Sequence, residues 1–118
     1  MRILVVDDEP SVRTFVTEVL RGAGHDTIVA ADGEEALNVR GHIDLLLTDL
    51  MMPRMTGDVL AVKMFTKQPT LKVLYLTAFS DSLFKKKVRL WNTEACLDKP
   101  VTPDELLEAV DVLLNAAS

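Results

Sequence analysis

The sequence predicts a doubly wound α/β fold, in which helices cover both faces of a parallel sheet. Three observations lead to this prediction. Short, uninterrupted apolar runs recur along the chain, as is typical of strands buried on both faces of a sheet. Patterns of amphipathic helices stand between these runs. Strict alternation of the two implies parallel strands joined by right-handed crossovers.

The expected strands are five short apolar runs. They occupy residues 3–6, 27–30, 45–48, 73–76 and 95–97. Because each run is short and continuous, it suits a strand buried on both faces better than a half-exposed strand, in which polar and apolar residues alternate.

The first helix is expected between the first two strands. Pro10 suits its first turn, since proline has no N–H to lose there, and Gly22 suits its end. One face of this helix carries apolar residues at the spacing of an amphipathic helix, namely Val12, Phe15, Val16, Val19 and Leu20.

Capping signals place the next helices. Asp32 can accept hydrogen bonds from the free N–H groups of a second helix, and Glu35 holds the reciprocal capping position. A third helix is expected over residues 58–66, before Pro69. A fourth is expected over residues 82–90, where three lysines at 85–87 interrupt the apolar pattern and form a solvated face.

The last helix has the clearest start. Thr102 supplies a cap, Pro103 a first-turn proline and Glu105 the acidic residue of a capping box. One apolar stripe then follows, made of Leu106, Leu107, Val110, Leu113 and Leu114.

Length and composition indicate one domain. The chain has 118 residues, 48% of them hydrophobic, which is enough for a single core, and we expect no output domain within residues 1–118. No apolar run approaches the roughly 18 residues of a membrane span, so we expect no membrane association and a cytoplasmic location. A net charge of −5 argues against direct binding to nucleic acid.

The single cysteine, Cys96, excludes an intrachain disulfide. Its neighbours Ala95 and Leu97 are apolar, so we expect a buried, unreactive thiol rather than a catalytic one.

Polar side chains follow four of the expected strands. In open parallel sheets, ligands bind beyond the carboxyl ends of the strands. The residues at those ends are Asp7 and Asp8, Asp49, Thr77 and Lys99. Three carboxylates, one hydroxyl and one ammonium group are therefore expected at one edge of the sheet.

This combination suits phosphoryl transfer with a hard cation. Clustered carboxylates repel one another unless a cation compensates, and an oxygen-rich site suits Mg²⁺, so Asp7, Asp8 and Asp49 are candidate metal ligands. Asp49 is also a candidate nucleophile, and Thr77 and Lys99 can hold the phosphoryl oxygens. Singly, each residue could be a helix cap, a loop former or ordinary surface. Their convergence on one edge favours a site.

Four segments resemble the receiver domains of two-component response regulators, including the single-domain chemotaxis regulators. They are VVDDEP with Asp7 and Asp8, LLLTDLMMPRMTG with Asp49, YLTA with Thr77 and LDKPVTPDEL with Lys99. The likeness extends from residue 3 to residue 114, nearly the whole chain. It implies a flavodoxin-like three-layer sandwich with five helices and the strand order 2-1-3-4-5.

The resemblance implies specific metal and acceptor roles. Asp49 matches the phosphoacceptor and Asp8 a direct metal ligand. Asp7 matches an acidic partner that acts largely through metal-bound water. Met51 would offer its backbone carbonyl to the same Mg²⁺, which the resemblance implies as the cofactor.

Other positions match the phosphoryl-binding and switch residues. Thr77 resembles the switch hydroxyl and Lys99 the lysine that contacts the phosphoryl group. Leu50 and Ala78 are further expected phosphoryl contacts, Ala78 through its backbone amide. Pro100 would follow a cis peptide bond.

The implied partners are a histidine kinase or a histidine phosphotransfer protein as phosphoryl donor, and an unknown downstream protein. The domain would phosphorylate and dephosphorylate itself rather than turn over an external substrate. Pro53 and Gly57 match the loop after the acceptor, where glycine lets the backbone approach the next helix closely.

The sequence departs from the family at Cys96, where receivers usually carry Tyr or Phe as the ring that reports phosphorylation. Trp91 or Phe84 could substitute for that ring, and residues 78–83 with the fourth helix could carry the signal instead.

Three alternatives stay open on the sequence. An aspartyl-phosphate phosphatase would have a second acid at the position of Met51. A flavin or nucleotide module would have a glycine-rich fingerprint, but Gly22 and Gly24 follow a helix rather than a strand. A receiver-like interaction module would not be regulated by phosphate.

Overall fold

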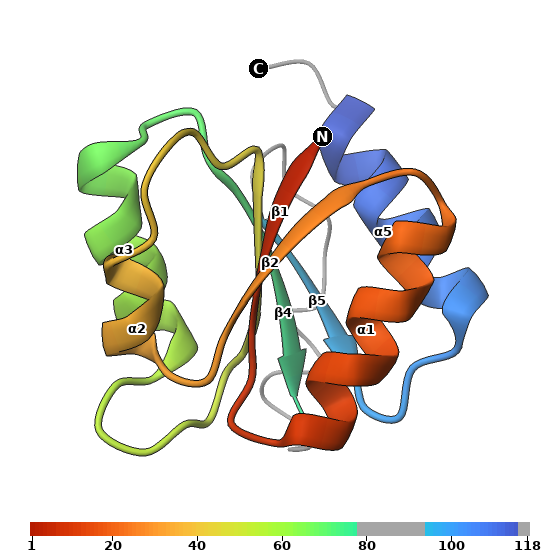
Figure 1. The fold of residues 1–118 in the computed structure, drawn as a ribbon, viewed down its shortest axis with the longest axis horizontal. Helices are drawn as coiled ribbons and strands as arrows, with labels where there is room; N and C mark the ends of the chain where they lie inside the picture. The colour runs from red at the N-terminus through yellow and green to blue at the C-terminus, as the bar shows by residue number, and fades with distance from the viewer. Residues whose placement is uncertain (78–93, 116–118) are drawn as a thin grey trace.

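The computed structural model describes residues 1–77 and 94–115, which form a sheet between two layers of helices (Figure 1). Five parallel strands follow the order β2-β1-β3-β4-β5. The strands are β1 (Arg2–Val6), β2 (Asp26–Ala30), β3 (Leu45–Asp49), β4 (Lys72–Thr77) and β5 (Glu94–Asp98). Each predicted strand lies within an observed one, so the predicted fold class and strand order are confirmed.

Helices cover both faces of this sheet. On one face lie α1 (Pro10–Gly22) and α5 (Pro103–Asn115), and on the other lie α2 (Gly33–Leu37) and α3 (Gly57–Lys67) (Figure 1). The fourth helix predicted over residues 82–90 lies outside the described residues. The same holds for Ala78, Phe84 and Trp91, whose predicted roles stay predictions.

The predicted helix caps are present. Asp32 accepts a hydrogen bond from the backbone N–H of Glu35 at 2.8 Å. The Glu35 side chain accepts from the N–H of Ala31 at 3.2 Å, one residue earlier than the capping-box pattern predicts. At the start of α5, Thr102 and Glu105 make both reciprocal bonds, at 3.1 and 2.9 Å.

The inner strands β1, β3 and β4 are buried on both faces, which explains their apolar runs. The edge strand β2 differs from the prediction, because it is only partly buried and its Val29 is 46% exposed. One core cluster packs β-strand side chains against α1 and α5, and a second packs the alternate side chains against α2 and α3. All five residues of β3 are buried. Phe15 differs from the prediction, because it is 37% exposed at the margin of the buried stripe of α1.

The thiol of Cys96 is buried, as predicted. Burial raises its pKa to about 11, and the negative charge of Asp98 adds to this effect, so the reactive thiolate is disfavoured. Among the helices of the described residues, none has the length and apolar character needed to cross a membrane.

Candidate functional site at the carboxyl edge of the sheet

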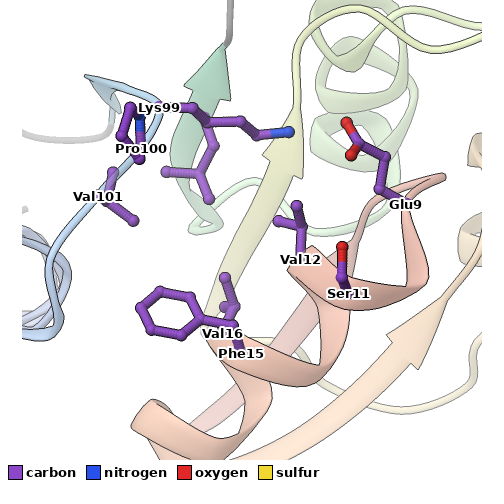
Figure 2. A pocket seen from close by; sticks show the side chains of 9 residues that line it. Glu9, Ser11, Val12, Phe15, Val16, Lys99, Pro100 and Val101 are labelled. Atoms are coloured by element: carbon purple, nitrogen blue, oxygen red, sulfur yellow. The ribbon is translucent and has the colours of Figure 1, made fainter.

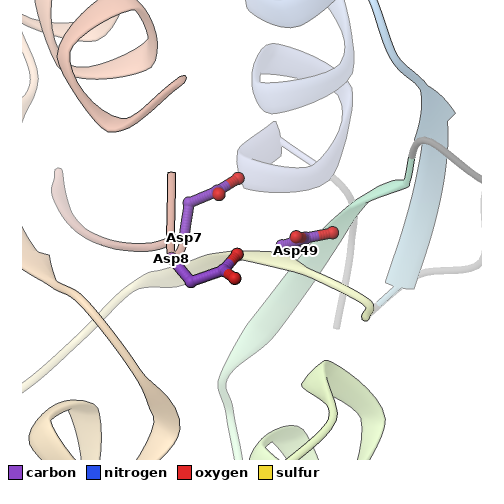
Figure 3. Close-up of side chains that lie close together, drawn as sticks. All are labelled: Asp7, Asp8 and Asp49. Carbon is purple, nitrogen blue, oxygen red and sulfur yellow. The ribbon is translucent and has the colours of Figure 1, made fainter. Parts of the chain in front are cut away.

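The carboxyl ends of four strands bring the predicted site residues together. Asp7 and Asp8 follow β1, Asp49 ends β3, Thr77 ends β4, and Lys99 follows β5. Because all strands are parallel, these ends share one edge of the sheet. The side chains of Asp7, Asp8 and Asp49 extend into the same space (Figure 3).

Burial divides these residues into an inner and an outer group. Asp7 and Thr77 are each 1% exposed, and Asp49 is 6% exposed. Asp8 is exposed. The site is therefore closed by protein on its inner side and open to water beside Asp8.

Lys99 links two of the carboxylates. Its Nζ lies 3.0 Å from Oδ2 of Asp7 and 3.5 Å from Oδ2 of Asp49. Its backbone N–H donates to the carbonyl of Thr77 at 2.7 Å, which fixes the lysine beside the end of β4. The peptide bond that follows, Lys99–Pro100, is cis, as predicted.

Charges around Lys99 keep it protonated. Burial works to lower its pKa, but the hydrogen bond and charge of Asp7, together with the charge of Asp49, raise it above the ordinary value. The side chain therefore presents a fixed positive charge to the site.

Asp49 is held in an unfavourable environment for a carboxylate. Burial raises its pKa, the charge of Lys99 acts in the opposite direction, and the negative charges of Asp7 and Asp8 raise it further. The backbone N–H of Met51 donates to Oδ1 of Asp49 at 3.4 Å. The carboxylate is thus incompletely compensated and gains from any cation that joins it.

Close backbone packing holds the turn after Asp49. The N–H of Gly57 donates to the carbonyl of Leu50 at 2.8 Å. A Cβ at Gly57 would lie 2.3 Å from the carbonyl oxygen of Asp49 and 3.1 Å from Cα of Leu50, so only glycine fits. This confirms the close approach predicted for Gly57.

Two details of this turn were not evident in the sequence. The amide of Leu50 donates to the carbonyl of Leu76 at 3.0 Å, and it is the amide of Met51 that faces the carboxylate of Asp49. Backbone directions in a turn depend on dihedral angles that residue types alone do not specify, so only the structure distinguishes these two N–H groups. Phosphoryl binding by Leu50 stays a prediction.

The three carboxylates fit a hard divalent cation. Asp7, Asp8 and Asp49 can each offer one oxygen atom, and these atoms lie within 4.8 Å of one another. Mg²⁺ prefers oxygen ligands and keeps several waters, which the exposed side at Asp8 allows. The donor set therefore suits Mg²⁺.

A cavity of about 550 Å³ adjoins the site between α1 and the segment after β5. Figure 2 shows Val12 and Phe15 of α1 and, across the cavity, Pro100 and Val101. Lys99 belongs to both the cavity and the carboxylate cluster. No pattern in the sequence indicated this cavity. Phe15, which was predicted to lie on the buried face of α1, lines the cavity and is exposed.

Comparison with known proteins agrees with this geometry. A family model described as the response regulator receiver domain matches residues 3–111. The sensor histidine kinase RcsC of Escherichia coli is 37% identical over 95% of this chain, and the DNA-binding response regulator MtrA of Mycolicibacterium smegmatis is 38% identical over 97%. The chain spans 12% and 50% of the lengths of these two relatives.

Solved structures show the same fold. The receiver domain of the hybrid histidine kinase CckA superposes with a TM-score of 0.82 at 33% identity, covering 98% of this chain and 100% of that one. The response regulator TrrA of Thermotoga maritima, solved in complex with Mg²⁺ and BeF, has a TM-score of 0.80 at 36% identity, covering 95% and 97% of the two chains.

Proposed function

The chain belongs to the response regulator receiver domain family, and we propose that Asp49 accepts a phosphoryl group from a histidine kinase or a histidine phosphotransfer protein. One observation carries the proposal. The buried carboxylate of Asp49 lies beside two further carboxylates and 3.5 Å from the ammonium group of Lys99. A nucleophile, a cation site and a fixed positive charge are the parts that phosphoryl transfer requires.

The transfer forms one bond and breaks one. A carboxylate oxygen of Asp49 attacks the phosphorus atom while the bond from phosphorus to the donor imidazole nitrogen breaks, and that nitrogen keeps the electron pair. Lys99 and the hydroxyl of Thr77 hold the phosphoryl oxygens, whose charge would otherwise repel the neighbouring carboxylates. The position of the Lys99 ammonium group, 3.0 Å from Oδ2 of Asp7 and 3.5 Å from Oδ2 of Asp49, supports this role.

A divalent cation completes the proposal. Asp8 and Asp49, with the carbonyl of Met51, would hold Mg²⁺ directly, and Asp7 would act largely through water. Bound there, Mg²⁺ supplies neutralisation of the negative charge that accumulates around the acceptor. The Mg²⁺ and BeF complex of the TrrA relative supports this assignment.

The phosphoryl donor would dock over the cavity beside α1. The residues that line this cavity are mostly apolar and include Val12, Phe15 and Pro100. Lys99 also lines the cavity, and its ammonium group lies 3.5 Å from the carboxylate of Asp49. A donor protein that presents phosphohistidine from an apolar helix face could bury that face here. Its phosphoryl group would then reach Asp49 past Lys99.

We also propose a domain organisation, a cellular location and a mode of output for this chain. We propose that residues 1–118 form a single receiver domain in the cytoplasm that modifies only itself and acts through an unknown downstream protein. The net charge of −5 disfavours direct contact of this domain with nucleic acid. The DNA-binding relative shows that the charge argument cannot be extended from this domain to a larger protein that contains it.

An intact-mass measurement tests the proposal. Incubation with acetyl phosphate and Mg²⁺ should add one phosphoryl mass to the parent protein and none to Asp49→Asn. Asp44→Asn, which changes the carboxylate just before the same strand, is the matched control and should be modified like the parent. Absence of the adduct from the parent would favour an interaction module that is not regulated by phosphate.

A further inference from the structure

Tyr75 is an aromatic residue that lies beside Cys96, the position at which this chain has no aromatic ring. In the register of the sheet, Tyr75 of β4 pairs with Cys96 of β5 on one side and with Thr48 of β3 on the other. Cys96 holds the position at which related receivers carry the reporter ring. The tyrosine is thus its direct cross-strand neighbour.

The two side chains point to the same face of the sheet. Leu74 and Leu76, which flank Tyr75, belong to the core under α1 and α5, whereas Tyr75 packs against the opposite core cluster. Ala95 and Leu97, which flank Cys96, likewise pack toward α1 and α5. Because side chains alternate along a strand, Tyr75 and Cys96 share the other face.

Thr77 lies on this face as well, two residues after Tyr75 on β4. Its backbone is bonded to Lys99, so the end of β4 is tied to the site. A movement of Thr77 is therefore expected to affect Tyr75, because both residues lie on β4 and on the same face of the sheet.

Among residues 1–77 and 94–115, one hydrogen bond directs the Tyr75 ring. The hydroxyl of Tyr75 donates to Oε1 of Glu94 at 3.2 Å, toward the start of β5 and away from the site. Burial and the charge of Glu94 raise the pKa of Tyr75, so its hydroxyl stays a neutral donor. The side chain is only half-buried, unlike its fully packed neighbours Leu74 and Leu76.

We propose that Tyr75 is the ring that responds to phosphorylation of Asp49, an inference that rests on the proposed function. When the hydroxyl of Thr77 donates to a phosphoryl oxygen, the Tyr75 ring leaves Glu94 and turns across Cys96. The small thiol makes this movement possible, because a ring at position 96 would occupy the same cross-strand space. Tyr75 thereby takes a positioning role that the family places on β5.

Fluorine NMR provides the test. The sequence contains one tyrosine, so the full chain labelled with 3-fluorotyrosine gives one tyrosine resonance. Mg²⁺ and beryllofluoride are then added, and the fluoride bound at Asp49 gives its own signal. We expect the bound signal together with a new position of the tyrosine resonance. A bound signal with an unmoved tyrosine resonance would overturn the inference and leave the proposed function intact, whereas absence of any bound signal would overturn both.

Variants separate ring movement from a mere electrostatic effect of the adduct. Cys96→Phe should block the movement, so that the adduct forms while the tyrosine resonance stays in place. Cys96→Ser is the matched control of similar size and should respond like the parent. Glu94→Gln weakens the bond to the hydroxyl and should shift the unliganded resonance toward its activated position. A full response in Cys96→Phe would contradict the proposal.

Discussion

The two ends of β3 carry the same residue type in opposite circumstances. Asp44 stands just before the strand and Asp49 ends it. Asp44 accepts from the backbone N–H of Arg2 at 2.8 Å and lies 3.1 Å from Nε2 of His42. The bond from Arg2 lowers the pKa of Asp44, against an opposing effect of burial. At this end, the carboxylate is satisfied by the fold itself.

Asp49 is not satisfied in this way. Burial raises the pKa of Asp49, and the carboxylates of Asp7 and Asp8 lie close enough to repel it. We call the Asp44 end of β3 its structural end and the Asp49 end, where we propose the phosphoryl and cation site, its functional end. A carboxylate that stabilises the fold is already paired, whereas one that binds a ligand is left for the ligand to compensate.

The largest expected effect concerns the backbone that supports the functional end. Gly57→Ala should lower the free energy of unfolding by about 3 kcal/mol, because its Cβ would overlap the carbonyl oxygen of Asp49. Urea unfolding gives this value. Gly22→Ala is the control: nothing lies within 4 Å of the added Cβ, so stability should be unchanged or slightly higher. Equal stability of Gly57→Ala and the parent would contradict the observed close packing.

The next largest effect on stability is expected from a substitution at the structural end of β3. Asp44→Ala leaves the N–H of Arg2 without its acceptor and should cost about 1.5 kcal/mol in the same unfolding experiment. Asp26→Ala removes an exposed carboxylate at the start of the neighbouring strand β2 and should change stability little. If the two variants were equally stable, Asp44 would have no special structural role.

Removing the charge at the functional end should stabilise the protein, whereas the two changes above should destabilise it. Asp49→Asn should raise the free energy of unfolding of the metal-free protein by about 1 kcal/mol, since a buried and repelled charge disappears. Asp8→Asn should act in the same direction but more weakly, because Asp8 is exposed. A loss of stability in both variants would refute the picture of crowded carboxylates.

Acidification should remove both charge effects, in a definite order. Asp49 has a raised pKa in the fold, so its destabilising charge is present above that pKa and vanishes first as the pH falls toward the ordinary value of 3.8. Asp44 has a lowered pKa, so its stabilising charge persists to below 3.8. As the pH falls, the free energy of unfolding of each variant should approach that of the parent. Asp49→Asn should reach the parent value at a higher pH than Asp44→Asn.

Much of this arrangement could be predicted from residue order. The apolar runs specify the strands, and parallel strands bring the residues that follow them to one edge, so Asp7, Asp49 and Lys99 could be grouped without coordinates. Capping residues such as Asp32 and Thr102 specified two helix starts in the same way. These features depend on local pattern and on topology.

Other features depend on geometry that pattern does not encode. The direction of the Met51 amide, the cavity beside Phe15 and the pairing of Tyr75 with Cys96 follow from backbone angles, side-chain packing and strand register. The sequence drew attention to Trp91 and Phe84 as substitute rings because they are aromatic. Tyr75 is distant from Cys96 in sequence, and only the strand register makes the two residues neighbours.

Thermal unfolding with and without Mg²⁺ tests most directly whether the carboxylate of Asp49, at the functional end, binds a cation. The melting temperature of the parent should rise with Mg²⁺, because a cation that binds the folded state alone stabilises it. Asp44→Asn should melt lower than the parent but show the same rise, whereas Asp49→Asn should show little or none. An equal rise in all three proteins would contradict the assignment of Asp49 to the cation site.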